Sequence, residues 1–258
     1  FSYGQGGLGK SLYLGTKEQI MSKREARLAF EMLIFGSLLI MSIYHFVLYL
    51  FRKKESSMLY FGIFCLLIAI RTLLVGEMFL VELIPNFNWA LQMKLHYISF
   101  YSGLPIFMVF VYKLYPEEMN KKYITVISSL GAIFSALVIL TSADIYVHTL
   151  KVYQIISFVS FIYLIYVLFL AINREREGAN LFGAGLLFLM ATVVDDILYY
   201  YQISPIGDIS SFGLFVFILV QSYIIAKRFS KAFQTIENLS DRLLSLDKLK
   251  DEFLANTS

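Results

Sequence analysis

The chain has 258 residues, of which 58% are hydrophobic and 16% charged, and its formal net charge is +3. Soluble globular domains have about 25% charged residues, so this composition excludes an ordinary soluble domain. The basic residues lie between apolar blocks rather than along one face, so the positive charge does not indicate a nucleic-acid partner.

Seven apolar blocks indicate membrane-spanning helices. A helix needs about 20 apolar residues to cross a hydrocarbon core of roughly 30 Å. The blocks cover residues 28–51, 58–75, 89–115, 123–140, 153–172, 181–201 and 212–226. They are continuous runs rich in Leu, Ile, Phe and Ala, unlike the alternating strands of a transmembrane barrel. We therefore predict an all-α membrane protein whose residues 28–228 form a seven-transmembrane helix bundle.

Lys and Arg are distributed unevenly among the loops, which predicts the orientation of the chain. The first, third and fifth loops and the segment after the last block contain or are flanked by Arg52, Lys53, Lys54, Lys113, Lys121, Lys122, Arg174, Arg176, Lys227, Arg228 and Lys231. The intervening loops, residues 76–88, 141–148 and 202–211, contain four acidic residues and no Lys or Arg. Because cytoplasmic loops are enriched in Lys and Arg, we predict an N-terminus outside and a C-terminus in the cytoplasm.

Residues 1–27 are predicted to be the end of an extracellular sensory domain and its linker. Four glycines between residues 4 and 9 indicate a turn-rich stretch, and residues 11–14 are a candidate short strand. Lys23, Arg24 and Arg27 oppose the charge rule, as a large translocated domain allows. Because the chain starts at Phe1 with no signal peptide before it, we expect a piece of a longer protein.

The segment 229–258 is amphipathic with the spacing of a coiled coil. Ile236, Leu239, Leu243 and Leu246 follow one another at steps of three, four and three residues. This spacing predicts a two-stranded coiled coil that continues the seventh helix and makes the protein a homodimer. The alternative is a single amphipathic helix that packs on another domain or on the membrane surface.

The last eleven residues, Lys-Leu-Lys-Asp-Glu-Phe-Leu-Ala-Asn-Thr-Ser, resemble the start of the dimerisation and phosphoacceptor helix of sensor histidine kinases. In that family the run continues with His-Glu-Leu-Arg-Thr-Pro. The resemblance implies a parent histidine kinase in the bacterial inner membrane, with ATP and Mg in its kinase domain and a response regulator as partner. The 258 residues themselves stop before the phosphoacceptor, so we expect them to be non-catalytic and to hold no cofactor.

The membrane region resembles the bacterial seven-transmembrane receptors with diverse intracellular signalling modules (7TMR-DISM). The residues that carry this resemblance are Phe35-Gly36, the segment 44–51, Tyr60-Phe61, the segment 95–100, Pro105, and Leu114-Tyr115-Pro116-Glu117. In that family an extracellular jelly-roll domain often precedes the helices. In the family this domain is thought to bind carbohydrates or other small molecules. The resemblance therefore implies two kinds of partner: a small-molecule ligand, of which carbohydrate is one class, and the lipid of the membrane.

Ionisable residues within the predicted helices form one layer near their outer ends. Such residues are functional candidates in membrane proteins. The ligand or signalling candidates are Arg71, Lys94, His96, Asp195 and Asp196, with Glu31 in the same layer. One interpretation is snorkelling together with ion pairs, such as Arg71 or Lys94 with Asp195 or Asp196. The other is an outward-facing ligand pocket or a docking surface for the extracellular domain.

Other features narrow the function. Pro105 lies inside the third helix and is expected to kink it, as a signalling hinge or as a static bend. His45, His96 and His148 do not have the spacing of a metal site, and the seventh helix has no internal Lys for a retinal Schiff base.

We therefore predict transmembrane signal sensing for a two-component histidine kinase. The alternatives are the same receptor type with a cyclase or phosphatase output, and a transporter. A transporter is disfavoured because the polar layer does not continue across the membrane.

Overall fold

The computed structural model describes residues 14–75, 77–84, 87–200, 203–204 and 209–257. This part of the chain contains nine helices and no strand. The helices are α1 (Lys17–Phe51), α2 (Ser56–Leu74), α3 (Phe79–Leu83), α4 (Trp89–Leu114), α5 (Lys121–Leu140), α6 (Ala143–Tyr146), α7 (Thr149–Asn173), α8 (Ala179–Tyr200) and α9 (Ser210–Thr257). Seven of these, all except α3 and α6, are long and apolar enough to cross a membrane. The predicted all-α seven-helix fold is confirmed.

The predicted boundaries agree with the structure within four residues for α2, α4, α5, α7 and α8. The exception among the starts is α1, which begins at Lys17 and not near residue 28. Thr16 caps this helix: its hydroxyl accepts from the Gln19 amide at 3.3 Å, and the Gln19 side chain accepts from the Thr16 amide at 3.1 Å. Much of the predicted linker is therefore helical, whereas residues 11–13 of the candidate strand lie outside the described residues.

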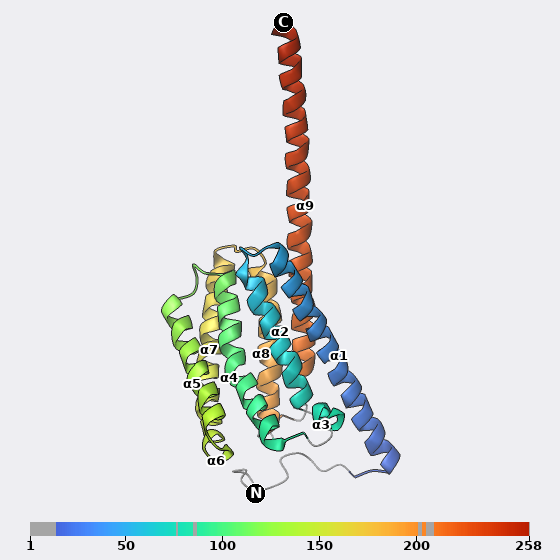
Figure 1. The fold of residues 1–258 in the computed structure, drawn as a ribbon, viewed down its shortest axis with the longest axis vertical. Helices are drawn as coiled ribbons and strands as arrows, with labels where there is room; N and C mark the ends of the chain where they lie inside the picture. The colour runs from blue at the N-terminus through green and yellow to red at the C-terminus, as the bar shows by residue number, and fades with distance from the viewer. Residues whose placement is uncertain (1–13, 76, 85–86, 201–202, 205–208, 258) are drawn as a thin grey trace. The chain divides into compact units, whose positions relative to one another are not determined.

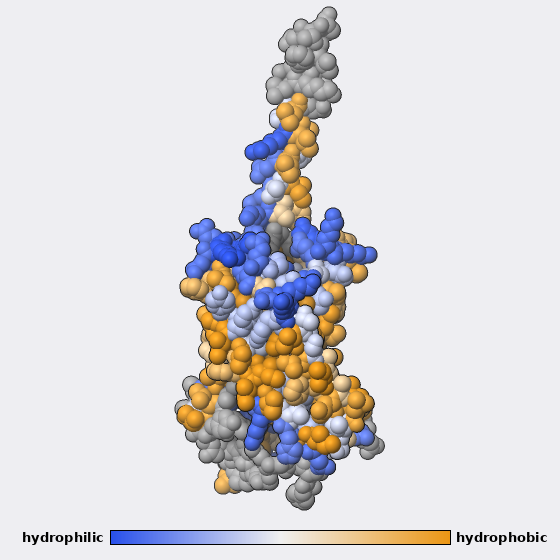
Figure 2. Space-filling model, turned by 90° about the vertical axis from the view of Figure 1, so that its left-hand side faces the viewer, coloured by the Kyte–Doolittle hydropathy of each residue, from blue (hydrophilic) through white to orange (hydrophobic). Residues whose placement is uncertain are grey.

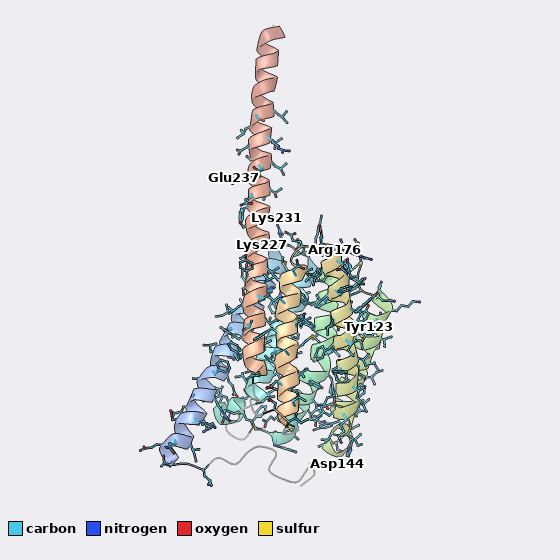
Figure 3. The ribbon with its side chains drawn as sticks, turned by 180° about the vertical axis from the view of Figure 1, so that it is seen from behind. Tyr123, Asp144, Arg176, Lys227, Lys231 and Glu237 are labelled. Atoms are coloured by element: carbon cyan, nitrogen blue, oxygen red, sulfur yellow. The ribbon has the colours of Figure 1, made fainter. Side chains whose placement is uncertain are left out.

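The helices of residues 1–218, which form one compact unit, are arranged in two rows. In Figure 1, α1, α2, α4 and α5 lie side by side, and each packs on the next. Figure 3, seen from behind, places α7 and α8 in front of that row. The start of α9 joins the second row, because Gly213 packs closely on Thr192 of α8 and the Phe212 ring lies 6.3 Å from that of Phe188.

Aromatic side chains fill the space between the two rows. The rings of Phe61, Phe107, Phe110, Phe182 and Phe217 lie within 4.8–6.5 Å of their neighbours in this cluster. All five side chains are buried. On the outside, Figure 2 shows an apolar band between two hydrophilic zones on the face near α5. This distribution is typical of a helix bundle solvated by lipid.

The loops define two ends of the bundle. The odd-loop end contains the connections α1–α2, α4–α5 and α7–α8, whereas the even-loop end contains α3, α6 and the connection α8–α9. In Figure 3, Arg176 lies at the odd-loop end and Asp144 at the even-loop end. The candidate residues of the polar layer belong to the even-loop half of their helices.

The second compact unit comprises residues 219–258, of which residues 219–257 belong to α9. The helix continues without a break from Ser210 to Thr257, so the predicted helical continuation of the seventh span is confirmed. The four seam residues Ile236, Leu239, Leu243 and Leu246 are all more than half exposed. The coiled coil therefore stays a prediction.

Candidate functional site

Arg71 lies in the last turn of α2 and contacts α4, not a carboxylate. Its Nη1 donates to the backbone carbonyl of His96 at 2.9 Å and to the hydroxyl of Ser99 at 3.2 Å. The guanidinium carbon lies 5.4 Å from the centroid of the Phe100 ring, which is within cation–π distance. The two candidate residues Arg71 and His96 are thus in contact, but through the backbone carbonyl of His96 and not through its imidazole ring.

Lys94 points to a different neighbour. Its ammonium donates at 2.9 Å to the carbonyl of Ile139, in the last turn of α5. The last carbonyls of a helix have no intrahelical donor and carry the negative end of the helix dipole, so this cation caps α5. Ion pairs of Arg71 or Lys94 with Asp195 or Asp196 were one expectation, and they are absent from the described part of the chain.

Asp195 and Asp196, near the end of α8, both contact the connection to α9. Asp195 accepts from the hydroxyl of Ser204 at 2.6 Å, and Asp196 accepts from the amide of Ile209 at 2.8 Å. Neighbouring residues on a helix point about 100° apart, which explains why the two carboxylates hold different residues. Both therefore hold described residues of the connection before the seventh span, Ser204 and Ile209.

A charged cluster on α1 and the α2–α3 turn was missed from the sequence. The Glu31 carboxylate accepts from the backbone amide of Glu77 at 3.2 Å and 3.3 Å. The Glu77 carboxylate pairs with Arg24 at 3.4 Å and with Arg27 at 3.9 Å. The basic residues before the first span oppose the charge rule, and the acidic loop at the same end is the signal in the sequence for this pairing.

Pro105, the hinge candidate, lies inside α4, which the structure assigns as one helix from Trp89 to Leu114. A helical proline has no amide to donate to the carbonyl four residues earlier, here that of Tyr101. The hydroxyl of Tyr153 on α7 donates to this carbonyl at 2.6 Å. Gly131 of α5 packs on the Pro105 ring, and a Cβ added there would lie 2.8 Å from the same carbonyl. Pro105 is therefore the point at which three helices meet.

The odd-loop end is held by a second charged cluster. Glu118, whose side chain is 1% exposed, accepts from Arg176 Nε at 2.6 Å and from Arg174 at 3.5 Å. Arg176 also binds the exposed Glu117. The hydrogen bonds to Glu118 and then to Glu117 raise the pKa of the Arg176 guanidinium above its ordinary value. This cluster joins the α4–α5 and α7–α8 loops.

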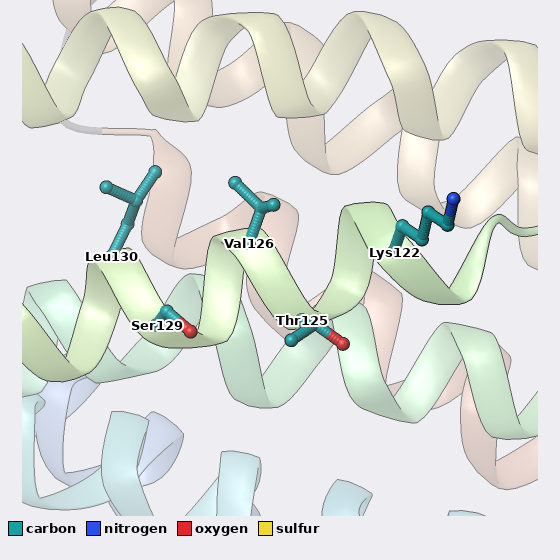
Figure 4. Close-up of a pocket in the computed structure, with 5 residues that line it drawn as sticks. All are labelled: Lys122, Thr125, Val126, Ser129 and Leu130. Carbon is teal, nitrogen blue, oxygen red and sulfur yellow. The ribbon is translucent and has the colours of Figure 1, made fainter.

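The surface has a shallow open hollow but it lacks the features of a ligand site. Figure 4 shows its lining, which comes from one helix, α5: Lys122, Thr125, Val126, Ser129 and Leu130. A small-molecule site usually buries most of its ligand between several elements. The described residues include no group of three or more His, Cys, Asp or Glu side chains that could hold a metal ion.

Comparison with known proteins identifies the membrane region. A family model described as 7TM diverse intracellular signalling matches residues 27–228, from α1 into α9. A search of curated proteins and a search of solved structures each gave no match. The matched region covers most of the chain and all seven long apolar helices. The members of this family are membrane receptor domains with intracellular signalling. The chain is therefore a multi-pass membrane protein that belongs to the 7TM diverse intracellular signalling family.

Proposed function

We propose that the chain is the receptor module of a sensor histidine kinase in the bacterial inner membrane. Its even-loop end faces the outside and its odd-loop end the cytoplasm. The support for this orientation is the charge of the loops, because basic loops such as residues 52–55 and 174–178 favour the cytoplasmic side. A change at the even-loop end, caused by a ligand or by an extracellular domain, would repack the bundle and displace α9.

The observation that carries this proposal is the length and composition of α9. Its 48 residues correspond to about 72 Å at 1.5 Å per residue, more than twice the roughly 30 Å of a hydrocarbon core. The same helix includes the seventh span and residues 248–257, which resemble the start of a phosphoacceptor helix. A continuous helix can transmit a displacement, so α9 connects a membrane receptor with a kinase output.

The exposed stripe of α9 favours a homodimer. With Ile236 and Leu243 at positions a, Leu239 and Leu246 occupy positions d of a heptad repeat. Arg242 then falls at g and Asp247 at the following e, which are positions of opposite charge that pair across parallel strands. A second copy of the chain would cover the four exposed apolar residues.

The proposed kinase output requires a kinase domain after residues 248–258, which resemble the start of a phosphoacceptor helix. ATP and Mg would bind in a kinase domain, and a response regulator would receive the phosphoryl group. The alternative outputs are a cyclase and a phosphatase. Residues 248–258 favour the kinase over both, because they resemble the start of its phosphoacceptor helix. A transporter would need polar groups along its whole path, whereas the candidate residues cluster at one end.

The reading frame after Ser258 and an autophosphorylation assay test the proposal. We expect a His-Glu-Leu-Arg-Thr-Pro run followed by an ATP-binding domain. The full-length protein in membrane vesicles, given radiolabelled ATP and Mg, should acquire an acid-labile phosphoryl group, and replacement of that His by Gln should abolish it. An unrelated domain after Ser258, or labelling that survives the His replacement, would contradict a histidine kinase output.

A further inference from the structure

The guanidinium of Arg71 has donors that the protein does not use. Both of its hydrogen bonds start from Nη1, to the His96 carbonyl and the Ser99 hydroxyl. Within the described part of the chain, Nε and Nη2 have no acceptor, although a guanidinium carries five N–H donors. The Arg71 residue is half-buried, and neither Nε nor Nη2 is among the fully buried polar atoms without a partner in the described part of the chain, so both keep contact with the surroundings.

Four of the described carboxylates at this end of the bundle have partners other than Arg71. Glu77 pairs with Arg24 and Arg27, and Glu31 accepts from the Glu77 amide. Asp195 and Asp196 hold the connection to α9. The positive charge of Arg71 is therefore balanced, among the described residues, only by a carbonyl, a hydroxyl and the face of the Phe100 ring.

The position of Arg71 adds a second argument. It lies in the last turn of a membrane-spanning helix, where the hydrocarbon core gives way to the headgroup zone. The bonds from Nη1 and the contact with Phe100 fix the plane of the guanidinium, so the fork is oriented before any ligand binds. A planar fork with two parallel donors matches two oxygens of a phosphate group.

We propose that Arg71 forms a phosphate-binding site, in which Nε and Nη2 hold two oxygens of one phosphate group. This inference names the ligand class for the receptor proposed above and rests on that function for its biological role, but the binding itself does not depend on a kinase output. The phosphate group belongs either to a soluble ligand or to the headgroup of an anionic lipid, because both present the same oxygens at this depth.

Lys94 supplies a matched control for Arg71. It is a second cation at the same end of the bundle, and its ammonium donates to the Ile139 carbonyl but lacks the planar pair of donors of a guanidinium. Lys94→Gln removes the same charge as Arg71→Gln without removing the fork. Arg71→Lys keeps the charge but lacks the planar pair of donors, and it serves as the test variant if Arg71→Gln does not fold.

The experiment measures the unfolding midpoint of the 258-residue chain in two series. In the first, inorganic phosphate is added to the protein in micelles of dodecyl maltoside, which contain no phosphate group, with sulfate-free chloride salt at constant ionic strength. In the second, phosphatidylglycerol is added to these micelles instead. A saturable rise in the midpoint in the first series identifies a soluble phosphate as the source, and a rise in the second alone identifies the lipid headgroup.

In either case we expect the wild-type chain and Lys94→Gln to show the rise with equal apparent affinity. Arg71→Gln and Arg71→Lys should weaken that affinity at least about tenfold, which corresponds to about 1.4 kcal/mol. If neither series gives a saturable rise, or if the rise is the same with Arg71→Lys and Arg71→Gln as in the wild type, the phosphate site is wrong. Because no phosphorylation is measured, failure of this site is separate from failure of the proposed output.

Discussion

The Tyr153 hydroxyl donates a 2.6 Å hydrogen bond to the backbone carbonyl of Tyr101, the acceptor that Pro105 leaves without its helical donor. Both tyrosines are 0% exposed. A buried carbonyl without a partner is costly, and in a membrane no water replaces the missing bond. A side chain from α7 thus compensates for a proline in α4, and this explains how the helix keeps Pro105 in its interior.

Removal of this hydroxyl should destabilise the bundle in a way that depends on Pro105. We expect Tyr153→Phe to lower the free energy of unfolding by about 1–3 kcal/mol, because a buried carbonyl loses its donor. Pro105→Ala restores an amide at that position, so Tyr153→Phe should cost less in the Pro105→Ala background. Unfolding in mixed micelles with increasing SDS measures all four proteins of the cycle. An equal cost in both backgrounds would show that the hydroxyl does not replace the proline's missing bond.

The close approach of α4 and α5 at Gly131 gives a second prediction. Gly131→Ala should destabilise the bundle, because the added Cβ would overlap the Pro105 ring and lie 2.8 Å from the Tyr101 carbonyl. Gly36 in α1 is the control, since a Cβ there meets nothing within 4 Å. Gly36→Ala should be neutral or stabilising by up to about 1 kcal/mol, because Ala is the better helix former. Equal unfolding curves for the two variants would mean that α4 and α5 do not pack closely here.

In the charged cluster at the odd-loop end, two adjacent carboxylates, Glu117 and Glu118, should contribute differently to stability. Glu118→Ala should lower the free energy of unfolding by about 1.5–3 kcal/mol, since a buried acceptor of charged hydrogen bonds is lost. Glu117→Ala should cost less than about 1 kcal/mol, because the Glu117 side chain is 69% exposed and its pair with Arg176 is solvated. The same unfolding assay compares the two, and a larger loss for Glu117→Ala would contradict the burial of Glu118.

The proposed homodimer predicts where α9 meets its partner. Leu239→Cys, at position d, should form a disulfide between two chains under mild oxidation, because d residues of parallel strands face each other. Asp241→Cys, two residues later on the opposite face, should remain monomeric under the same conditions. Cys65 is buried and common to both variants. Non-reducing gels measure the result, and equal cross-linking at both positions would rule out this seam.

The seven spans could be predicted from the sequence because each is a continuous apolar block, and lipid requires such blocks. The short helices α3 and α6 could not, since five and four residues are too few to show a period. The start of α1 at Lys17 was missed because residues 17–27 are polar, and the capping pair of Thr16 and Gln19 was the available signal.

The candidate site could be predicted only in part. Hydropathy predicts the depth of Arg71, Lys94 and the two aspartates, whereas their partners depend on which helix faces which. Lys94 and Arg71 each donate to a main-chain carbonyl, which every residue has, so no residue type in the sequence could identify these two partners. The bond from Tyr153 to Tyr101 joins residues 52 positions apart and likewise required the packed bundle.

Autophosphorylation of the full-length protein after insertions in α9 tests whether this helix transmits the state of the receptor. Seven residues inserted after Thr235 preserve the heptad phase of the seam, whereas four residues rotate the following segment relative to the bundle. If α9 transmits the state of the receptor to a dimeric kinase, the seven-residue insertion should keep autophosphorylation near the wild-type level, and the four-residue insertion should shift it several-fold in either direction. Equal activity of the two insertion proteins would contradict transmission through α9.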